Sequence, residues 1–168
     1  MKKIRLLFAL TLCITFSGCL KDKTCKPKSP DSELPQIQAF AATNGITTTA
    51  DPSGLHYQII EQGNGPSANA NSKIIITYTG TLMNGTVFDE QLTPNTEPWT
   101  LGGLIKGWII GIPLIQEGGH IKLIIPSSLG YGCDQYYAIP GNSVLYFDCK
   151  YAPSNAEGCG LPLSLAEL

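Results

Sequence analysis

Residues that usually build a metal or hydrolytic centre are scarce in this chain. There are two histidines in 168 residues, and none of the six cysteines belongs to a CxxC pair. A Ser-His-Asp arrangement of the hydrolytic kind and a glycine-rich phosphate-binding loop are also lacking. We therefore expect no metal site and no cofactor.

An excess of basic charge and a long hydrophobic run are lacking as well. The 11 Lys and Arg residues are outnumbered by 13 Asp and Glu residues and form no basic stripe, so we expect no nucleic-acid partner. The mostly apolar stretch 4–16 is about a dozen residues long, whereas a membrane span needs roughly 20. Preceded by Lys2 and Lys3, this stretch has the proportions of a signal peptide covering residues 1–18.

The segment Phe16-Ser17-Gly18-Cys19 resembles the lipobox of bacterial lipoproteins, with Phe16 where Leu is usual. The resemblance implies cleavage before Cys19 and acylation of Cys19. The protein would then be lipid-anchored to a bacterial membrane in the cell envelope, on its periplasmic or outer-membrane face. An ordinary secreted protein that is cleaved nearby is the alternative. Because residues 1–18 hold three basic and no acidic residues, the mature chain would carry a net charge of −5.

Four cysteines remain after Cys13 leaves with the signal peptide and Cys19 is acylated. They are Cys25, Cys133, Cys149 and Cys159. An even number of cysteines in an exported protein allows two disulfides in three connectivities, among which the sequence does not choose. A zinc site and free buried thiols are the alternatives.

The mature chain has the length of one domain with short additions. We expect a Lys-, Pro- and Ser-rich tether over residues 19–30, an N-terminal helix and connector over 31–52, a domain over 53–151 and a tail over 152–168. Ser32 is the expected helix cap, and Asn44-Gly45 is the expected stop. The helix could pack on the domain or simply extend it.

The pattern within 53–151 predicts strands with one short helix between them. Alternation begins at Gly54, and β-branched residues fill 73–82. Asn84-Gly85 predicts a type I′ hairpin that leads into a strand at 86–89. Further strands are expected at 120–125 and 143–151, and a short helix at 107–115. We therefore expect an α+β fold in which a curved antiparallel sheet wraps over the helix.

Six stretches in this order resemble one known family. They are Ile76-Thr77-Tyr78-Thr79-Gly80, Gly85-Thr86-Val87-Phe88-Asp89, Leu104-Ile105-Lys106-Gly107-Trp108, Leu129-Gly130-Tyr131-Gly132, Ile139-Pro140 and Val144-Leu145-Tyr146-Phe147-Asp148. Together they resemble an FKBP-type peptidyl-prolyl cis-trans isomerase in a bacterial lipoprotein form. The resemblance implies a five- or six-stranded sheet and an apolar pocket between the sheet and the helix.

The resemblance also implies which residues line the pocket. The expected catalytic set is Tyr78, Phe88, Asp89, Ile105, Trp108, Tyr131 and Phe147, and the expected substrate-binding set is Trp99, Leu104 and Ile139. Trp108 would form the floor under the substrate proline ring, and Asp89 would orient Tyr78. The Tyr131 hydroxyl and the Ile105 backbone N–H would hold substrate carbonyls. Read without the motif order, these aromatics would simply be core residues.

Two features lie outside the matched motifs. His56 and His120 are interpreted as surface residues on strands without a catalytic role. The loop between Gly132 and Ile139 is short, and Asn142 stands where many relatives have His. These departures bear on substrate preference and on the macrolide ligands that the resemblance allows.

The expected function is peptidyl-prolyl isomerisation that assists the folding of exported proteins. The partners would be proline-containing segments of unfolded or exported proteins. A catalytically weak FKBP-like chaperone or binding module is the alternative. A purely structural envelope lipoprotein is a third reading, but it would leave an intact apolar pocket unexplained.

Overall fold

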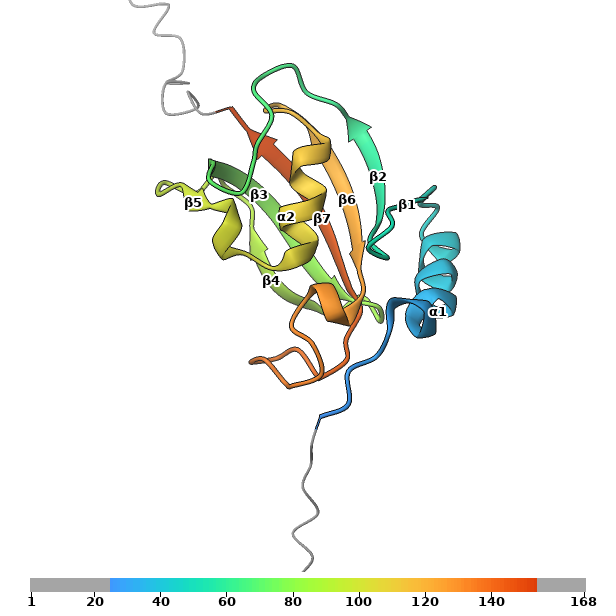
Figure 1. The fold of residues 1–168 in the computed structure, drawn as a ribbon. Coiled ribbons are helices and arrows are strands. Elements are labelled where there is room, and N and C mark those ends of the chain that lie inside the picture. Colours follow the sequence, from blue (N-terminus) through green and yellow to red (C-terminus); the bar gives the residue numbers. More distant parts are fainter. Residues whose placement is uncertain (1–24, 154–168) are drawn as a thin grey trace, which may run out of the picture.

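A curved antiparallel sheet holds a short helix against its concave face (Figure 1) in the computed structural model, which describes residues 25–153. The seven strands are arranged in the order β1-β2-β6-β7-β3-β4, and β5 pairs with β3. Their bounds are β1 Thr49–Ala50, β2 His56–Glu61, β3 Lys73–Leu82, β4 Val87–Gln91, β5 Trp99–Thr100, β6 His120–Ile125 and β7 Leu145–Ala152. The expected signal peptide, Cys19 and most of the tail, with Cys159, lie outside the described residues.

The fold class is the one that the sequence predicts, with more strands than expected. Five strands are five to ten residues long, and β1 and β5 have two residues each. The family resemblance implied five or six strands, and the two short pairings, which give no periodic signal in the sequence, bring the number to seven. β3 and β6 span the residues predicted for them, 73–82 and 120–125.

The main core lies between the sheet and the short helix α2, Lys106–Gly111, which a 3-10 turn, Ile112–Leu114, extends. Ile121, Leu123 and Ile125 of β6 point into this core and are fully buried. Pro113 lies in the 3-10 turn, where the α-helix has already ended, because proline cannot continue its hydrogen bonding. The helix is therefore held at the concave face, beside the aromatic residues of β3 and β7.

A second helix, α1, covers part of the opposite face of the sheet. It runs over Pro30–Thr43, and its Ile37 packs with Ile124 of β6 in a second buried cluster. Successive residues of a strand point to opposite faces, so Ile124 faces away from the core that contains Leu123 and Ile125. The N-terminal helix thus packs on the domain rather than extending from it.

Two details of chain geometry differ from the sequence-based expectation. The N-cap of α1 is Ser29, with Pro30 in the first turn, and Ser32 lies inside the helix and donates its hydroxyl to the Ser29 carbonyl at 2.7 Å. The hairpin between β3 and β4 is present, but its turn is not type I′. Only Gly85, and not Asn84, has a positive φ, of 85°, whereas type I′ needs both. The Gly85 N–H donates to the Leu82 carbonyl at 2.9 Å.

No helix within residues 25–153 is long and apolar enough to cross a membrane.

Candidate functional site

A cavity of about 300 Å³ lies between α2 and the concave face of the sheet. It is lined by Tyr78, Asp89, Trp99, Leu104, Ile105, Trp108, Tyr131 and Phe147. The sheet contributes residues from β3, β4, β5 and β7, while α2 and the residues just before it contribute the opposite wall. The structure therefore brings eight of the ten expected pocket residues to one cavity.

Three aromatic side chains build the apolar floor of this cavity. The Trp108 ring lies edge-on to Tyr78, with centroids 5.0 Å apart, and to Phe147, with centroids 5.3 Å apart. Edge-to-face packing of this kind fixes ring orientations. Trp108 is 4% exposed, and its indole Nε1 has no hydrogen-bond partner among the described residues. The floor is consequently a closely packed apolar surface.

A hydrogen bond joins the two strands that carry the polar side of the cavity. The Tyr78 hydroxyl of β3 donates to Asp89 Oδ2 of β4 at 2.6 Å, which is the contact expected for Asp89. Burial and this bond raise the pKa of Tyr78 well above its ordinary value. The hydroxyl therefore keeps its proton, and the bond holds the Asp89 carboxylate at the cavity wall.

Two further donors flank the cavity. Burial, followed by the charges of Tyr136 and Asp89, raises the pKa of Tyr131, so its hydroxyl stays a donor at neutral pH. Ile105 is the N-cap residue of α2, and its carbonyl accepts the first bonds of that helix. Within the described part of the chain no protein acceptor takes the Ile105 N–H. Both groups can thus offer a proton to a carbonyl oxygen of a bound ligand.

A second cavity, of about 400 Å³, adjoins the first and shares Asp89 and Tyr131 with it. The remaining two expected residues, Phe88 and Ile139, line this second cavity. Tyr136 and Tyr137 also line it, and sequence reasoning assigned them no role. Tyr136 stacks on Tyr131 with centroids 4.3 Å apart and ring planes 8° apart. A pair of adjacent tyrosines in a loop gives no periodic signal, so only the family motif beside it pointed to this place.

The histidines lie outside both cavities, and one of them differs from the expectation. His56 is 9% exposed and is therefore buried rather than a surface residue. Its Nδ1 lies 3.4 Å from Thr48 Oγ1. The polar connector before β2 forms strand β1, whose Ala50 pairs with His56, and a polar sequence gives no sign of this pairing. His120 is half-buried and contacts Asp148 on the face of the sheet away from the cavities.

One disulfide is present among the cysteines of residues 25–153. Cys25 is bonded to Cys133, while Cys149 is a buried free thiol whose pKa burial raises well above its ordinary value. An Asp134 carboxylate oxygen and the sulfur atoms of Cys25 and Cys133 lie within 4.8 Å of one another, but the disulfide occupies both sulfur atoms. Residues 25–29, expected within a flexible tether, are thereby fastened to the domain.

The two cavities combine apolar aromatic surfaces with a few polar groups. Their linings contain one carboxylate and no serine, cysteine or histidine. An apolar aromatic floor with hydrogen-bond donors beside it, between a curved sheet and a short helix, is the arrangement that the resemblance to the FKBP type predicts.

Comparisons with known proteins establish the family. The model of the FKBP-type peptidyl-prolyl cis-trans isomerase family matches residues 65–151. FkpA of Escherichia coli K12, named an FKBP-type peptidyl-prolyl cis-trans isomerase, is 40% identical over 115 residues, which are 67% of this chain and 42% of FkpA. The chain therefore belongs to the FKBP-type peptidyl-prolyl cis-trans isomerase family, and it spans less than half the length of this relative.

Solved structures agree with this assignment. The crystal structure of FkpA from Escherichia coli superposes with a TM-score of 0.65 at 32% identity, covering 74% of this chain and 60% of that one. The crystal structure of AtFKBP13 superposes with a TM-score of 0.58 at 35% identity, covering 64% of this chain and 98% of that one. A fungal relative, FK506-binding protein 4 of Mycosarcoma maydis, is 37% identical over 126 residues, covering 74% of this chain and 33% of the relative.

Proposed function

We propose that this chain catalyses cis–trans exchange of X–Pro bonds in polypeptides. The observation that carries the proposal is the cavity over Trp108, which an aromatic floor, Tyr131 and Ile105 line together. The barrier to rotation, about 18–20 kcal/mol, arises from amide conjugation, so a catalyst needs neither a nucleophile nor a metal. It needs to bind the twisted amide more tightly than the planar one.

Each part of the cavity contributes to that preference. The proline ring would rest on Trp108, between Tyr78 and Phe147, and this contact would fix one side of the bond. The apolar walls would remove water that stabilises the planar, polar amide. Donors at Tyr131 and Ile105 would hold the carbonyl groups on the other side. A rate gain of about 10⁴ would need only about 5.5 kcal/mol of preferential binding.

The second cavity extends the binding surface beyond the proline. It shares Asp89 and Tyr131 with the first cavity, so a peptide whose proline rests on Trp108 would place a neighbouring side chain there. The walls formed by Phe88 and Tyr136 favour a large apolar neighbour. Macrolide ligands remain a prediction, supported by a relative that is named an FK506-binding protein.

The isomerase proposal is tested on the full chain with a short proline peptide. Exchange of the X–Pro bond is followed by NMR, with several residues in turn before proline, and we expect acceleration that a chelator does not reduce. Absence of acceleration by a well-folded protein would instead favour a binding module or chaperone that uses the same cavities.

We further propose that the protein acts on exported proteins in the cell envelope, anchored through Cys19. The proposal rests on the signal-like residues 1–18 and on the lipobox-like Phe16-Ser17-Gly18-Cys19. Cys19→Ala should abolish acylation and leave the protein unprocessed or soluble. Mass spectrometry of the mature N-terminus checks this, and an unmodified N-terminus beyond Cys19 would contradict it.

A further inference from the structure

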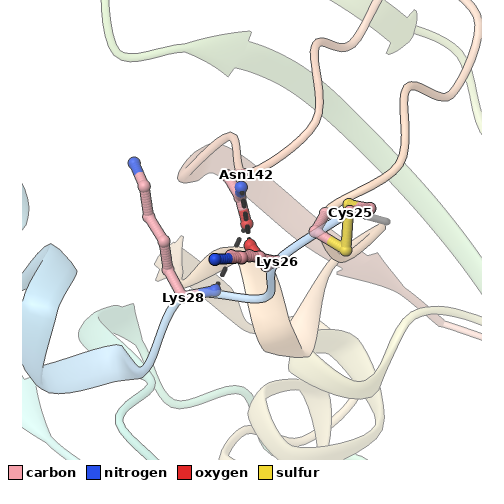
Figure 2. Close-up of a disulfide and its surroundings, with 5 residues drawn as sticks. Cys25, Lys26, Lys28 and Asn142 are labelled. Atoms are coloured by element: carbon pink, nitrogen blue, oxygen red, sulfur yellow. Dashed lines mark hydrogen bonds between the residues drawn. A yellow bond between two sulfur atoms is a disulfide. The ribbon is translucent and has the colours of Figure 1, made fainter. Parts of the chain in front are cut away.

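Residues 25–33, called the strap below, are fastened to residues 127–142, called the pocket loop, at three places. Cys25 is disulfide-bonded to Cys133. Asn142 Nδ2 donates to the Lys26 carbonyl at 3.1 Å, and the Lys28 N–H donates to Asn142 Oδ1 at 3.3 Å. Figure 2 shows these contacts side by side. Segments more than 100 residues apart in the sequence are thus joined by a covalent bond and by two hydrogen bonds between the Asn142 side chain and the strap backbone.

The third contact is buried and lies at the other end of the strap. Glu33 in the first turn of α1 is 2% exposed, and its Oε2 accepts the Ser127 N–H at 2.8 Å. A buried carboxylate is retained only where it is hydrogen-bonded, so this contact ties α1 to the start of the pocket loop. The strap is therefore bonded to the pocket loop at both ends of the strap, at Cys25 and at Glu33.

The strap contacts the pocket loop at Cys133 and Asn142, and these two residues form the base of the loop, where its two sides come together. Asn142 has a φ of 58°, a left-handed conformation that is uncommon outside glycine, and its own N–H donates to the Gly132 carbonyl at 2.9 Å. Nearer the tip, Tyr136 and Ile139 exchange both backbone hydrogen bonds, at 2.9 and 2.8 Å. The loop is therefore a closed unit whose position is set at its base.

The same loop carries one wall of the second cavity. Tyr131, Tyr136 and Ile139 all lie within it, and Tyr136 stacks on Tyr131. Residue 131 lies two positions before Cys133, and Ile139 lies three before Asn142. A displacement of the base would consequently move the stacked rings relative to Phe88, which lies on β4, outside the loop.

We propose that the strap positions the pocket loop, so that Cys25, Cys133, Asn142 and Glu33 are positioning residues for the second cavity. This inference rests on the proposed function, because it assigns the second cavity to the residue next to the substrate proline. The cross-link reduces the number of arrangements open to the loop. Losing it should weaken binding of a large neighbouring side chain and leave the aromatic floor of Trp108, Tyr78 and Phe147, which lies outside the loop, in place.

The test compares two peptides on the full chain, one with Phe and one with Ala before proline. Their dissociation constants are measured by NMR titration, which does not need catalysis, and their exchange rates are measured in parallel. In the disulfide-bonded protein the Phe peptide should bind on the order of 10-fold more tightly, from the apolar area buried. In the Cys25→Ser/Cys133→Ser protein this ratio should fall to about 2-fold or less.

Reduction of the unaltered protein gives an independent comparison. A dithiol such as dithiothreitol converts the disulfide to two thiols and is itself oxidised to a cyclic disulfide. It should lower the Phe-to-Ala ratio in the unaltered chain and leave the ratio of the double variant unchanged. This control separates Cys25–Cys133 from any disulfide that involves residues outside the described part of the chain.

A second variant avoids the thiols altogether. Asn142→Gly keeps a residue suited to a positive φ and removes both strap hydrogen bonds, so it should lower the ratio by about 2- to 5-fold. The matched controls are Lys26→Ala and Lys28→Ala, because those residues contribute only backbone atoms. Their ratios should match that of the unaltered protein.

The outcomes are distinguishable. A Phe-to-Ala ratio that stays within about 2-fold of the original in both the double variant and Asn142→Gly would overturn the inference. So would equal weakening of both peptides, because it would show a general structural role. A protein that binds with the expected selectivity but accelerates no exchange would refute the proposed isomerase activity and support the positioning role.

Discussion

Two polar side chains at the rim of the first cavity offer a sharp probe of the proposed chemistry. Tyr131→Phe removes one donor, and Asp89→Ala removes the acceptor of the Tyr78 hydroxyl. Each should lower kcat/KM by roughly 10-fold, while the free energy of unfolding changes by no more than about 1–2 kcal/mol. Peptide exchange assays and urea unfolding measure the two quantities.

Tyr146→Phe is the matched control for these variants. It removes a hydroxyl bonded to Asp148 at 3.3 Å on the other face of the sheet, so kcat/KM should not change. Unchanged activity in both Tyr131→Phe and Asp89→Ala would contradict the assigned roles. Trp108→Ala is a poorer probe, because opening a core cavity costs about 3–5 kcal/mol and confuses folding with catalysis.

His56 gives a pH prediction. Burial lowers its pKa below the ordinary value of 6.5, so the unfolded chain binds a proton more readily than the folded one. Stability is therefore lost as the pH falls below about 6.5, and a His56→Gln variant should lose less. Urea unfolding at about pH 7.5 and about pH 5 measures the difference.

Asp51, five positions before His56, is another group whose pKa the fold changes. Hydrogen bonds with Ser53 lower the pKa of Asp51. The fold therefore also loses stability when Asp51 is protonated, but only at pH values below the ordinary Asp51 pKa of 3.8 and equally in all variants. Equal pH slopes for the unaltered protein and His56→Gln would refute the prediction.

At the residue scale, motif order predicted where aromatic side chains meet, and spacing alone could not. Tyr78, Trp108 and Phe147 come from three separate elements, yet all line one cavity. Asn95 has a structural role that the sequence did not predict. It lies between β4 and β5, is buried and accepts the Ile76 N–H at 2.8 Å. A loop asparagine that completes a strand's hydrogen bonding has no sequence pattern of its own.

Among the elements, strands with strong local preference were predicted more closely than turns. β3 is rich in β-branched residues, which favour extended backbone, and its span was predicted directly. The Asn84-Gly85 hairpin was expected, but its turn type was not. The register of β3 and β4 shifts between Gly80 and Thr81, and a bulge of this kind depends on tertiary pairing rather than on two turn residues.

The close packing of helix α2 on strand β6 leads to a prediction about how these two elements fit together. A Cβ at Gly107 would lie 2.5 Å from Ile125 Cγ2, which is closer than packed atoms allow. Gly107→Ala should therefore lower the free energy of unfolding by about 1–3 kcal/mol through overpacking. Gly103→Ala is the matched control, because a Cβ there meets nothing within 4 Å. Urea unfolding of both variants checks this, and equal midpoints would contradict the tight helix seat.

On the scale of the whole molecule, the sequence predicted the isomerase-like domain but not what holds its N-terminal segment. The Lys- and Pro-rich composition of residues 19–30 is typical of a mobile tether. The structure instead joins Cys25 to Cys133 and packs α1 on the outer face of the sheet. Four candidate cysteines leave three pairings open, and only the fold brings these two together.

This cross-link leads to the last prediction. The two cysteines are 108 positions apart, and a loop of that size restricts the unfolded chain by up to about 5 kcal/mol in the chain-entropy model. Reduction should therefore lower the urea midpoint of the unaltered protein, whereas a Cys25→Ser/Cys133→Ser variant should start low and not respond. Thiol counting of denatured, unreduced protein should also find Cys149 reactive but Cys25 and Cys133 blocked. An unchanged urea midpoint after reduction would show that the Cys25–Cys133 disulfide does not stabilise the fold, and it would contradict this prediction.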